Sequence, residues 1–508
     1  MRRLWRRAAA SAAVVAGWLG LTAHVGTTLV VQQGTAGPYA LRVLVRPPGV
    51  IPGLVQVTIR ASGAIPRELS IQPALWRYGT KGAPPPEIAT PVPGEPGTFA
   101  TQLWIMSSGS YAFHVKASGA EGSGSFIVPF TSAATLTLSM PKGLGAILAA
   151  LGGVLVLGVL TIVGAASREG TLAAGLTPDA TRRRRARRSM ALAGGVLAVA
   201  VFGGAKWWDA VEGDYRRSLY RSLAVSSSVS AGDARTLTLV VTDSNWNFQP
   251  NRESPRRGIL SPLMPDHGKL MHLFLVQAGG AGAAAHLHPT RVNERTFSTS
   301  VPALPAGSYW LFADVVHESG YARTLVDTVD VPAGSAALNA DGDDAIALSL
   351  PRAEQGVALA DGGRLQITMQ GAPAAGGDVL VRATVTEANG APSPLSAWLG
   401  MAGHAMLLRT DGQVFVHLHP MGTGSMAAAE RLARREAGDT TSYGANQPTS
   451  HAEHQLSAVP GVAAMGEVSF PVAFPTAGSY RVIVQVRRVG HAVETGMIEV
   501  VVPPGAVQ

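Results

Sequence analysis

Two uncharged apolar runs separated by a cluster of arginines constrain this chain more than any other feature of its sequence. Residues 143–166 and 189–205 carry no charged side chain, and the segment between them contains the motif TRRRRARR. About 20 apolar residues cross a bilayer, and short arginine-rich loops stay in the cytoplasm. The sequence therefore predicts transmembrane helices at 143–166 and 189–206, joined by an arginine-rich cytoplasmic loop at 167–188.

The N-terminus carries a third apolar segment. Four arginines within the first seven residues precede a short apolar run. This pattern is typical of a signal peptide or an N-terminal membrane anchor, and we assign residues 1–26 to one of these two roles. With two to three transmembrane helices in the lipid bilayer, the remaining regions are expected on the periplasmic, extracytoplasmic side of an inner membrane.

The basic charge is confined to the segments that flank the apolar runs. The formal net charge is +8, and the region 167–188 holds seven arginines against two acidic residues. Outside that region and the N-terminus the chain is close to neutral. A nucleic-acid-binding protein would spread basic side chains over a folded face, so no nucleic acid is expected as a partner.

A strand signal recurs three times in the outer regions. The segments SGSYAFHVKASG, AGSYWLFADVVHESG and AGSYRVIVQVRRVG begin at residues 108, 306 and 477. After Gly-Ser-Tyr, apolar and polar residues alternate with the period of a half-buried strand. The sequence predicts a mainly β protein with three antiparallel β-sandwich domains, at 35–135, 230–335 and 360–503.

The second and third predicted sandwiches share a histidine pattern. The motif His-Leu-His-Pro occurs at 286–289 and again at 417–420, with another histidine 14 or 13 residues earlier. Between this motif and the Gly-Ser-Tyr strand, the third sandwich is longer by an insertion at 424–464, which includes a predicted helix.

The histidines of this pattern have the arrangement of metal ligands. Residues i and i+2 of a strand point to the same face, so each His-Leu-His presents two imidazoles side by side. The chain has no cysteine, which excludes thiolate zinc sites and blue-copper centres. Nearby thioethers favour copper over zinc. The candidate ligands are His272, His286, His288, His404, His417, His419, Met401 and Met421.

Other readings of these residues remain open. The same histidines could bond to backbone carbonyls and only hold strands together, with the methionines as core filler. His267 is a ligand or a loop residue, and His317 and His491 are weaker ligand candidates in turns. His451 and His454 form either a second cluster or a solvated surface, and His24 and His114 are read as structural. The DGDD segment at 341–344 is read as a solvated linker rather than a calcium loop.

Catalytic motifs do not appear in the sequence. There is no G-x-S-x-G elbow, no H-E-x-x-H helix motif and no phosphate-binding loop. The sequence therefore predicts a protein that is not an enzyme.

Several blocks resemble a known group of extracytoplasmic modules. The segment PYALRVLVRPPGVIPGLVQVTIRASG resembles the opening of YtkA-like and FixH-like domains, and the two histidine-containing blocks resemble the same immunoglobulin-like or cupredoxin-like modules. The resemblance implies copper handling near respiratory-oxidase assembly, by the six histidines of the two blocks. We expect a membrane-anchored protein that binds, buffers or delivers copper, with a copper-receiving envelope protein as partner. The second and third sandwiches would bind a copper ion each, or bind it jointly. The alternative is a non-enzymatic envelope scaffold whose histidines are structural.

Overall fold

The computed structural model describes residues 29–505, except 77, 174, 233, 247–262, 280–281, 335–340, 440–461 and 464–465. The predicted N-terminal segment 1–26, with His24, lies outside the described residues, as do His451 and His454. The chain forms two units: Met1–Ala133 with Arg221–Gln508, and Ala134–Tyr220. Each unit is described by itself.

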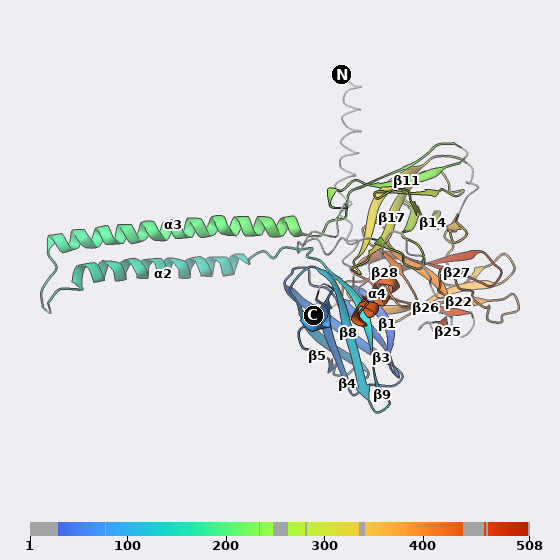
Figure 1. The fold of residues 1–508 in the computed structure, drawn as a ribbon, viewed down its shortest axis with the longest axis horizontal. Coiled ribbons are helices and arrows are strands. Elements are labelled where there is room, and N and C mark those ends of the chain that lie inside the picture. Colours follow the sequence, from blue (N-terminus) through green and yellow to red (C-terminus); the bar gives the residue numbers. More distant parts are fainter. Residues whose placement is uncertain are drawn as a thin grey trace, which may run out of the picture. The chain divides into compact units, whose positions relative to one another are not determined.

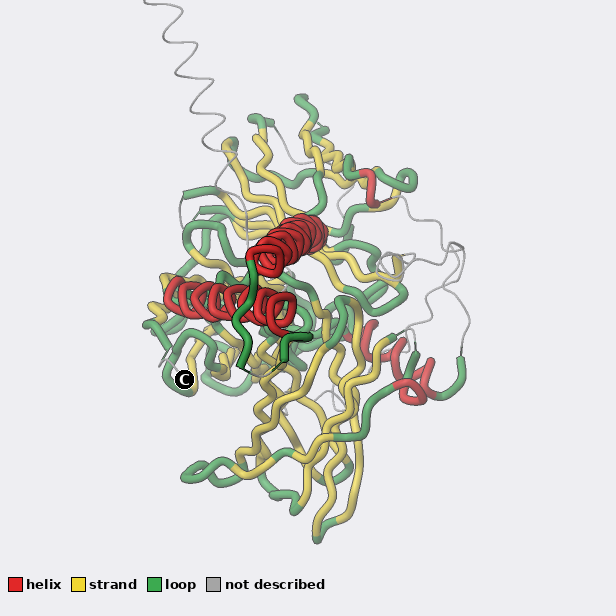
Figure 2. The backbone as a smooth tube through the Cα atoms, turned by 90° about the vertical axis from the view of Figure 1, so that its left-hand side faces the viewer, coloured by secondary structure: helices red, strands yellow, loops and turns green. Residues whose placement is uncertain are grey.

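The first unit is built from antiparallel β-sheets (Figure 1). In the described part of the chain, six sheets form three pairs, and each pair encloses its own apolar core. Strands dominate the tube view, with helix confined to a few segments (Figure 2). The prediction of a mainly β protein with antiparallel sheets is confirmed.

The first sheet pair follows the predicted range 35–135 closely. One sheet has the order β1 (Val30–Ala36), β2 (Tyr39–Arg46), β3 (Gly53–Ser62), β7 (Thr98–Ile105), β6 (Thr90–Pro91). The other has the order β5 (Glu87–Ile88), β4 (Glu68–Leu75), β8 (Gly109–Gly119), β9 (Gly122–Ser132). Alternate residues such as Val43 and Val115 point into the core between the two sheets.

The second sheet pair extends past the predicted end of its domain. One sheet has the order β10 (Val225–Val229), β11 (Thr236–Val241), β16 (Thr296–Ser300), β15 (Thr290–Arg291). The other has the order β12 (Leu263–Met264), β17 (Gly307–His317), β13 (His272–Gln277), β14 (Ala284–Leu287), β19 (Ala345–Ala347), and β18 (Ala322–Val331) also pairs with β17. Strand β19 follows directly after the DGDD segment at 341–344, which was predicted as a linker, and pairs with β14.

The third sheet pair contains the predicted helical insertion. Its sheets have the orders β20 (Val357–Ala358), β21 (Arg364–Gln370), β22 (Asp378–Thr386), β26 (Glu467–Ala473), β25 (Val462–Ala463), and β24 (Phe415–Leu418), β23 (Gly403–Arg409), β27 (Gly478–Arg487), β28 (Val493–Val502). Helix α4 (Met426–Glu436) begins after Ser425, whose hydroxyl accepts a hydrogen bond from the Ala428 amide.

The repeated tyrosine has the same role in all three sheet pairs. The hydroxyls of Tyr111, Tyr309 and Tyr480 each donate to the main-chain carbonyl four residues earlier, at 3.1, 2.9 and 2.9 Å. This bond ties the strand start to the preceding turn and satisfies the buried hydroxyl. It explains why Gly-Ser-Tyr recurs at the start of β8, β17 and β27.

The second and third sheet pairs pack against each other through apolar side chains. In β13, Leu273 and Leu275 point into the core of their own sheet pair, whereas Phe274 and Val276 point to the other side. There they meet side chains of the third pair, among them Met406. Both faces of β13 and β23 are therefore buried, as their nearly continuous apolar sequences require.

The first sheet pair contacts the third through polar bonds. Arg42 and Arg60 both pair with the buried Asp378, the former at 2.8 Å. The turn after β24 also bonds to β1, because the Gln33 amide donates to the Met421 carbonyl at 2.7 Å. Helix α4 adds to this junction, since Arg435 lies over the Trp76 ring, 4.2 Å from its centroid.

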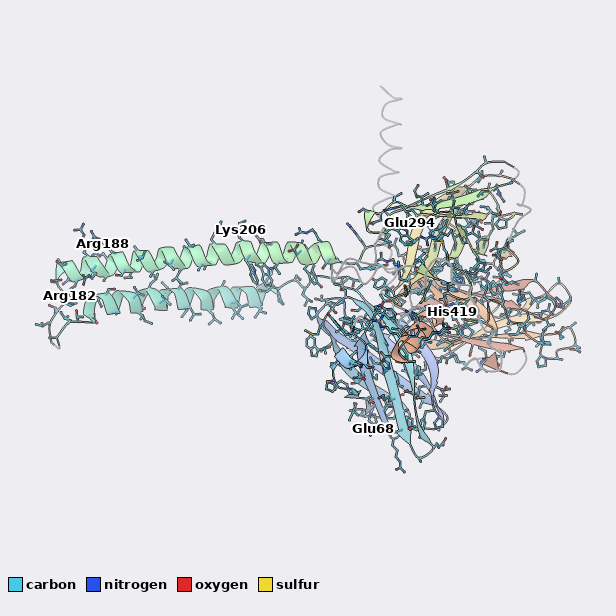
Figure 3. All side chains as sticks on the ribbon, in the orientation of Figure 1. Glu68, Arg182, Arg188, Lys206, Glu294 and His419 are labelled. Atoms are coloured by element: carbon cyan, nitrogen blue, oxygen red, sulfur yellow. The ribbon has the colours of Figure 1, made fainter. Side chains whose placement is uncertain are left out.

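The second unit is a pair of apolar helices. Helices α2 (Lys142–Glu169) and α3 (Ala180–Ser218) run side by side (Figure 1), and both are long and apolar enough to cross a membrane. Helix α3 begins earlier than predicted, because Asp179 caps it by accepting a bond from the Arg182 amide. Arginines placed in the predicted loop therefore stand on helical turns. Arg182 and Arg188 lie at the end where the helices connect (Figure 3).

Candidate metal centre

Seven imidazoles converge between the second and third sheet pairs. Each of the six predicted histidines is at most 8% exposed. His267, from the turn between β12 and β13, joins them, with its ring 4.9 Å from that of His419. Figure 3 shows His419 close to α4, among the sheets of the first unit. Histidines that sequence reasoning placed in two separate domains thus share one buried cluster.

The strand registers explain this convergence. His286 lies opposite Phe274 in the β13–β14 pairing, and His417 lies opposite Met406 in the β23–β24 pairing. Phe274 and Met406 belong to the apolar contact between the two sheet pairs. The histidines therefore occupy the faces of β14 and β24 that are turned toward the neighbouring sheet pair, as the i, i+2 rule requires.

Three of the rings form a metal-ligand geometry. One nitrogen each from His272, His286 and His417 lies within 4.8 Å of the other two. Nδ1 of His272 is 3.1 Å from Nε2 of His286. Two of these ligands come from the second sheet pair and one from the third, so the triad is a joint site of both.

Bonds on the outer side of the rings orient two of the histidines. Nε2–H of His272 donates to the Asp266 carbonyl at 3.0 Å, so its Nδ1 lone pair faces the triad. Nδ1 of His288 lies 3.1 Å from a carboxylate oxygen of Asp344, which leaves Nε2 for the cluster. Metal-binding histidines characteristically donate their other ring N–H to a carbonyl or carboxylate in this manner.

Burial keeps five of the imidazoles neutral. It lowers the pKa of His272, His286, His404 and His417 well below the ordinary value, and it lowers the pKa of His419 to about 3. A neutral imidazole has the free lone pair that a metal ion needs. Burial also raises the pKa of Asp314 to about 7, against the opposing hydrogen bond from Thr324.

Several imidazole nitrogens are buried without a partner. Among the described residues, nothing forms a hydrogen bond with Nε2 of His288, Nε2 of His417 or either ring nitrogen of His404. Leaving a buried polar atom unpaired costs about 1–3 kcal/mol, and such atoms are rare in native structures. A cation that accepts these lone pairs removes that cost, so the donor set fits a metal.

A cavity of about 120 Å³ opens beside the cluster. His272, His417 and His419 line it together with the carboxylates of Asp266 and Asp314. Residues of the first sheet pair and of α4 complete the wall, which makes the cavity a junction of all three sheet pairs. The cavity thus brings two carboxylates next to three imidazoles of the cluster.

The two halves of the cluster are related by the internal repeat. In the second sheet pair, the rings of His272, His286 and His288 have centroid separations of 5.4, 4.7 and 5.2 Å. The corresponding rings in the third pair, His404, His417 and His419, are 5.5, 4.3 and 5.4 Å apart. Each sheet pair therefore supplies the same triangle of imidazoles.

The methionines lie at the border of this cluster. Met401 is fully buried and exchanges main-chain hydrogen bonds with Trp398. Met421 is partly exposed, and its carbonyl bonds to β1. Neither thioether is among the ring contacts that define the cluster, so a ligand role for them stays a prediction. Met264, Met271 and Met406 pack in apolar clusters.

The remaining histidines lie outside the cluster. The ring of His317 packs against Trp246 at 5.9 Å, and His114 pairs with Glu436 at 3.5 Å. The side chain of His491 is 41% exposed. None of these three belongs to the ring contacts among the seven imidazoles.

Sequence reasoning missed the acidic members of the site. The interpretation of DGDD as a solvated linker is wrong for Asp344, whose side chain is 2% exposed and bonded to His288. The proximity of Asp314 to His417, at 3.5 Å, was also missed. Asp314 in β17 corresponds to Gln485 in β27, because each lies opposite the first histidine of its own repeat, His272 or His404. An acidic residue at this repeated position was the sequence signal that could have identified Asp314.

The fold and the site define a class: a histidine cluster enclosed between two antiparallel sheet pairs, in a chain with two apolar helices. Residues 221–333 and 358–503 match the family described as "Domain of unknown function (DUF8832)". These matches span just over half of the chain, and the protein belongs to this family. The matched segments contain most of the second and third sheet pairs, without β19, and all seven imidazoles of the cluster.

No curated protein matches this chain. Among solved structures, latent PorU from Porphyromonas gingivalis is similar at 10% identity and a TM-score of 0.14, covering 94% of this chain and 34% of that one. The chain thus spans about a third of that structure's length. A putative membrane anchored protein from Corynebacterium diphtheriae is similar at 9% identity and a TM-score of 0.13, with 95% and 97% covered. Similarities this low establish neither fold nor function.

Proposed function

We propose that this protein binds copper in the cluster formed jointly by its second and third sheet pairs, and buffers the ion or delivers it to a partner. One observation carries the proposal: nitrogens of His272, His286 and His417, from two different sheet pairs, lie within 4.8 Å of one another. A structural role would not require rings from separate sheet pairs to bring their nitrogens this close together.

The donor set supports copper over zinc. Imidazole suits both ions, but for a given nitrogen site the affinity of divalent metals rises to a maximum at Cu²⁺. The cluster has no thiolate, because the chain has no cysteine. A thiolate-dependent electron-transfer centre is therefore not part of the proposal, and binding with transfer of the ion is its simplest use.

The helix pair supports a membrane-anchored protein with its sheets outside the cytoplasm. Arg182 and Arg188 lie where α2 and α3 connect, and short arginine-rich connections stay in the cytoplasm (Figure 3). The start of α2 and the end of α3 would then both face the periplasmic side of an inner membrane. The resemblance to YtkA-like and FixH-like immunoglobulin-like or cupredoxin-like modules points to the same location and stays a prediction.

The second candidate function is that of an envelope scaffold with structural histidines. It is favoured by the bonds of His272 to the Asp266 carbonyl and of His288 to Asp344. These bonds are equally expected of a metal site, where they orient the ligands. The unpaired nitrogens of His404 and His417 have no place in a structural role, so metal binding is preferred.

Calorimetric titration of the detergent-purified full chain with Cu(II), in competition with a chelator of known affinity, tests the proposal. His286→Ala and His417→Ala should each weaken binding at least about 100-fold, since each removes one of three ligands. His491→Asn, in an exposed turn, is the matched control and should bind as the wild type does. Unchanged affinity in the double variant His286→Ala/His417→Ala would reject the proposal and leave the scaffold.

A further inference from the structure

Four imidazoles of the cluster are not part of the triad. Three of them, His267, His404 and His419, have ring centroids 5.8, 4.9 and 5.4 Å apart. The rings of the triad itself are separated by 5.4, 5.3 and 5.5 Å. A second group of three rings with the same spacing therefore stands beside the first.

The two groups are in direct contact. The His417 ring of the triad is 4.3 Å from His419 and 5.5 Å from His404. His267 lies 6.1 Å from the ring of His272. Ions held by the two groups would be close neighbours, without an intervening layer of protein.

We infer that the cluster binds two metal ions of the same class, the second held by His267, His404 and His419 with the Asp266 carboxylate beside it. This inference rests on the proposed function, since the first ion occupies the triad of His272, His286 and His417. The second ion would have one ligand ring from the second sheet pair and two from the third. The first ion would have two ligand rings from the second sheet pair and one from the third.

Asp266 is placed to serve the second position. Its Oδ1 lies 3.4 Å from Nε2 of His267 and accepts a hydrogen bond from the Ala427 amide at the start of α4. The residue is 7% exposed and lines the cavity together with His419. A carboxylate oxygen is an accepted ligand of Cu²⁺ and Zn²⁺, and the helix start holds this one in place.

The carboxylates around the cluster favour bound cations. Three buried or half-buried carboxylates contact its rings: Asp266 at His267, Asp314 at His417 and Asp344 at His288. Within the described parts of the chain, none of the three pairs with a lysine or arginine. Carboxylates removed from water need compensating charge. Cations bound in the cluster supply this charge.

His404 gives independent support for the second position. It is fully buried, and neither of its ring nitrogens has a hydrogen-bond partner in the described residues. It is not one of the three rings whose nitrogens already converge. A single ion in the triad would leave this buried imidazole, which lies beside Trp398, without a partner, at a cost that a second ion removes.

Copper counting and spin counting on the same sample test this inference. The detergent-purified full chain is loaded with Cu(II) sulfate, loosely held ions are removed by dialysis against glycine, and bound copper is measured by mass spectrometry. Electron paramagnetic resonance then gives the number of uncoupled Cu(II) spins. The expected wild-type result is two coppers per chain with fewer spins than coppers, because adjacent Cu(II) ions couple.

Variants assign the second ion to its ligands. His267→Asn and His419→Asn should each hold one copper per chain with one full spin, and His491→Asn should keep two. Retention of the first ion shows that the variants are folded. If the wild type held one copper with one full spin, the inference of a second ion would be wrong and the proposed function would stand. If the wild type held no copper, both the inference and the proposed function would be wrong. Two coppers in both His267→Asn and His419→Asn would also overturn the assignment.

Discussion

His267 and Leu399 occupy the same position in two copies of one turn, and both have a φ of 51°. Asp266 and Lys269 exchange main-chain hydrogen bonds of 2.9 and 3.0 Å around the first turn, as Trp398 and Met401 do at 2.8 and 3.1 Å around the second. A glycine with positive φ follows in each. Positive φ at both central residues is the geometry of a type I′ turn, which favours asparagine or glycine.

Histidine at this position has a conformational cost, which indicates that its imidazole has a role. The left-handed conformation costs a residue with a Cβ roughly 1–2 kcal/mol, and asparagine tolerates it better. His267→Asn should therefore leave the metal-free protein as stable as the wild type, or up to about 1 kcal/mol more stable. The same change should lower its copper capacity. Chemical denaturation of the metal-free chain and a copper titration measure the two effects.

Leu399→Asn is the matched control for this change. It alters the equivalent turn of the third sheet pair, so its backbone effect should be similar, but it should bind copper as the wild type does. If metal-free His267→Asn lost more than about 2 kcal/mol, the imidazole would be a packing element of the turn.

The pairing of His-x-His on one face could be predicted from the sequence, because the two-residue period of a strand fixes it. The joint burial of the two motifs could not. The segment HLFLV in β13 is apolar at both odd and even positions, which signals a strand buried on both sides. It does not say what covers the second face. The structure shows that the third sheet pair covers the second face of β13, where it contacts Phe274.

Asp344 shows the limit of local reasoning. It lies 56 residues after His288, in a short acidic segment whose composition is typical of an exposed turn. Its burial follows from the pairing of β19 with β14, and a strand of three residues has too little pattern to be recognised. The turn that contains His267 could be predicted more readily from the sequence, because His-Gly and Leu-Gly stand at equivalent places in the two repeats.

Asp344→Asn tests whether His288 is a further ligand beside the triad. It should weaken copper binding about 10–100-fold, the usual effect of losing the partner that orients a metal-binding histidine. The introduced carboxamide could still accept a hydrogen bond from the His288 main-chain amide, but its neutral oxygen would hold the imidazole less firmly. Competition titration measures the change. Asp343→Asn, in the adjacent residue that pairs with Lys269 at 3.3 Å, is the control and should bind copper normally. Equal affinities in both variants would mean that His288 is not a ligand.

Arg488 anchors a buried ion-pair network in the third sheet pair, away from the histidines. The residue is 1% exposed, and its guanidinium lies 2.6 Å from Glu494 and 2.7 Å from Asp361. Arg488→Gln leaves these carboxylates, which are 16% and 34% exposed, without their cation, and should destabilise the protein by about 1–3 kcal/mol near neutral pH. Urea denaturation of the variant against the wild type measures this. Arg352→Gln, at an arginine that is 63% exposed, should change stability by less than about 1 kcal/mol.

The effect of Arg488→Gln should depend on pH. Hydrogen bonds from Arg488 and from the Gly363 amide lower the pKa of Asp361 to about 2. A carboxyl group with a lowered pKa stabilises the folded state above its unfolded pKa, near 4, and loses that contribution as the pH falls toward 2. The difference between variant and wild type should therefore be full at pH 6 and shrink between pH 4 and pH 2. A difference that stays constant over this range would show that the carboxylates do not set it.

Gly422 joins the turn after the second His-Leu-His to the first sheet pair. Its φ is 127°, and a Cβ at this position would lie 1.9 Å from the Val31 carbonyl oxygen. Its own carbonyl accepts a hydrogen bond from the His419 amide at 2.9 Å. Gly422→Ala should therefore push β1 away and shift His419, at a cost of about 1–3 kcal/mol. Hydrogen exchange in residues 30–36 and the rate of copper release to a chelator should both rise.

Gly438→Ala is the control that separates the steric clash of Gly422→Ala from its backbone strain. Gly438 also has a positive φ, 95°, but no atom of the described residues lies within 4 Å of a Cβ placed there. This variant should lose stability through strain alone and keep wild-type exchange in β1 and wild-type copper release. If Gly422→Ala loosened β1 without accelerating copper release, the first sheet pair would be a neighbour of the metal centre that does not hold its ligands in place.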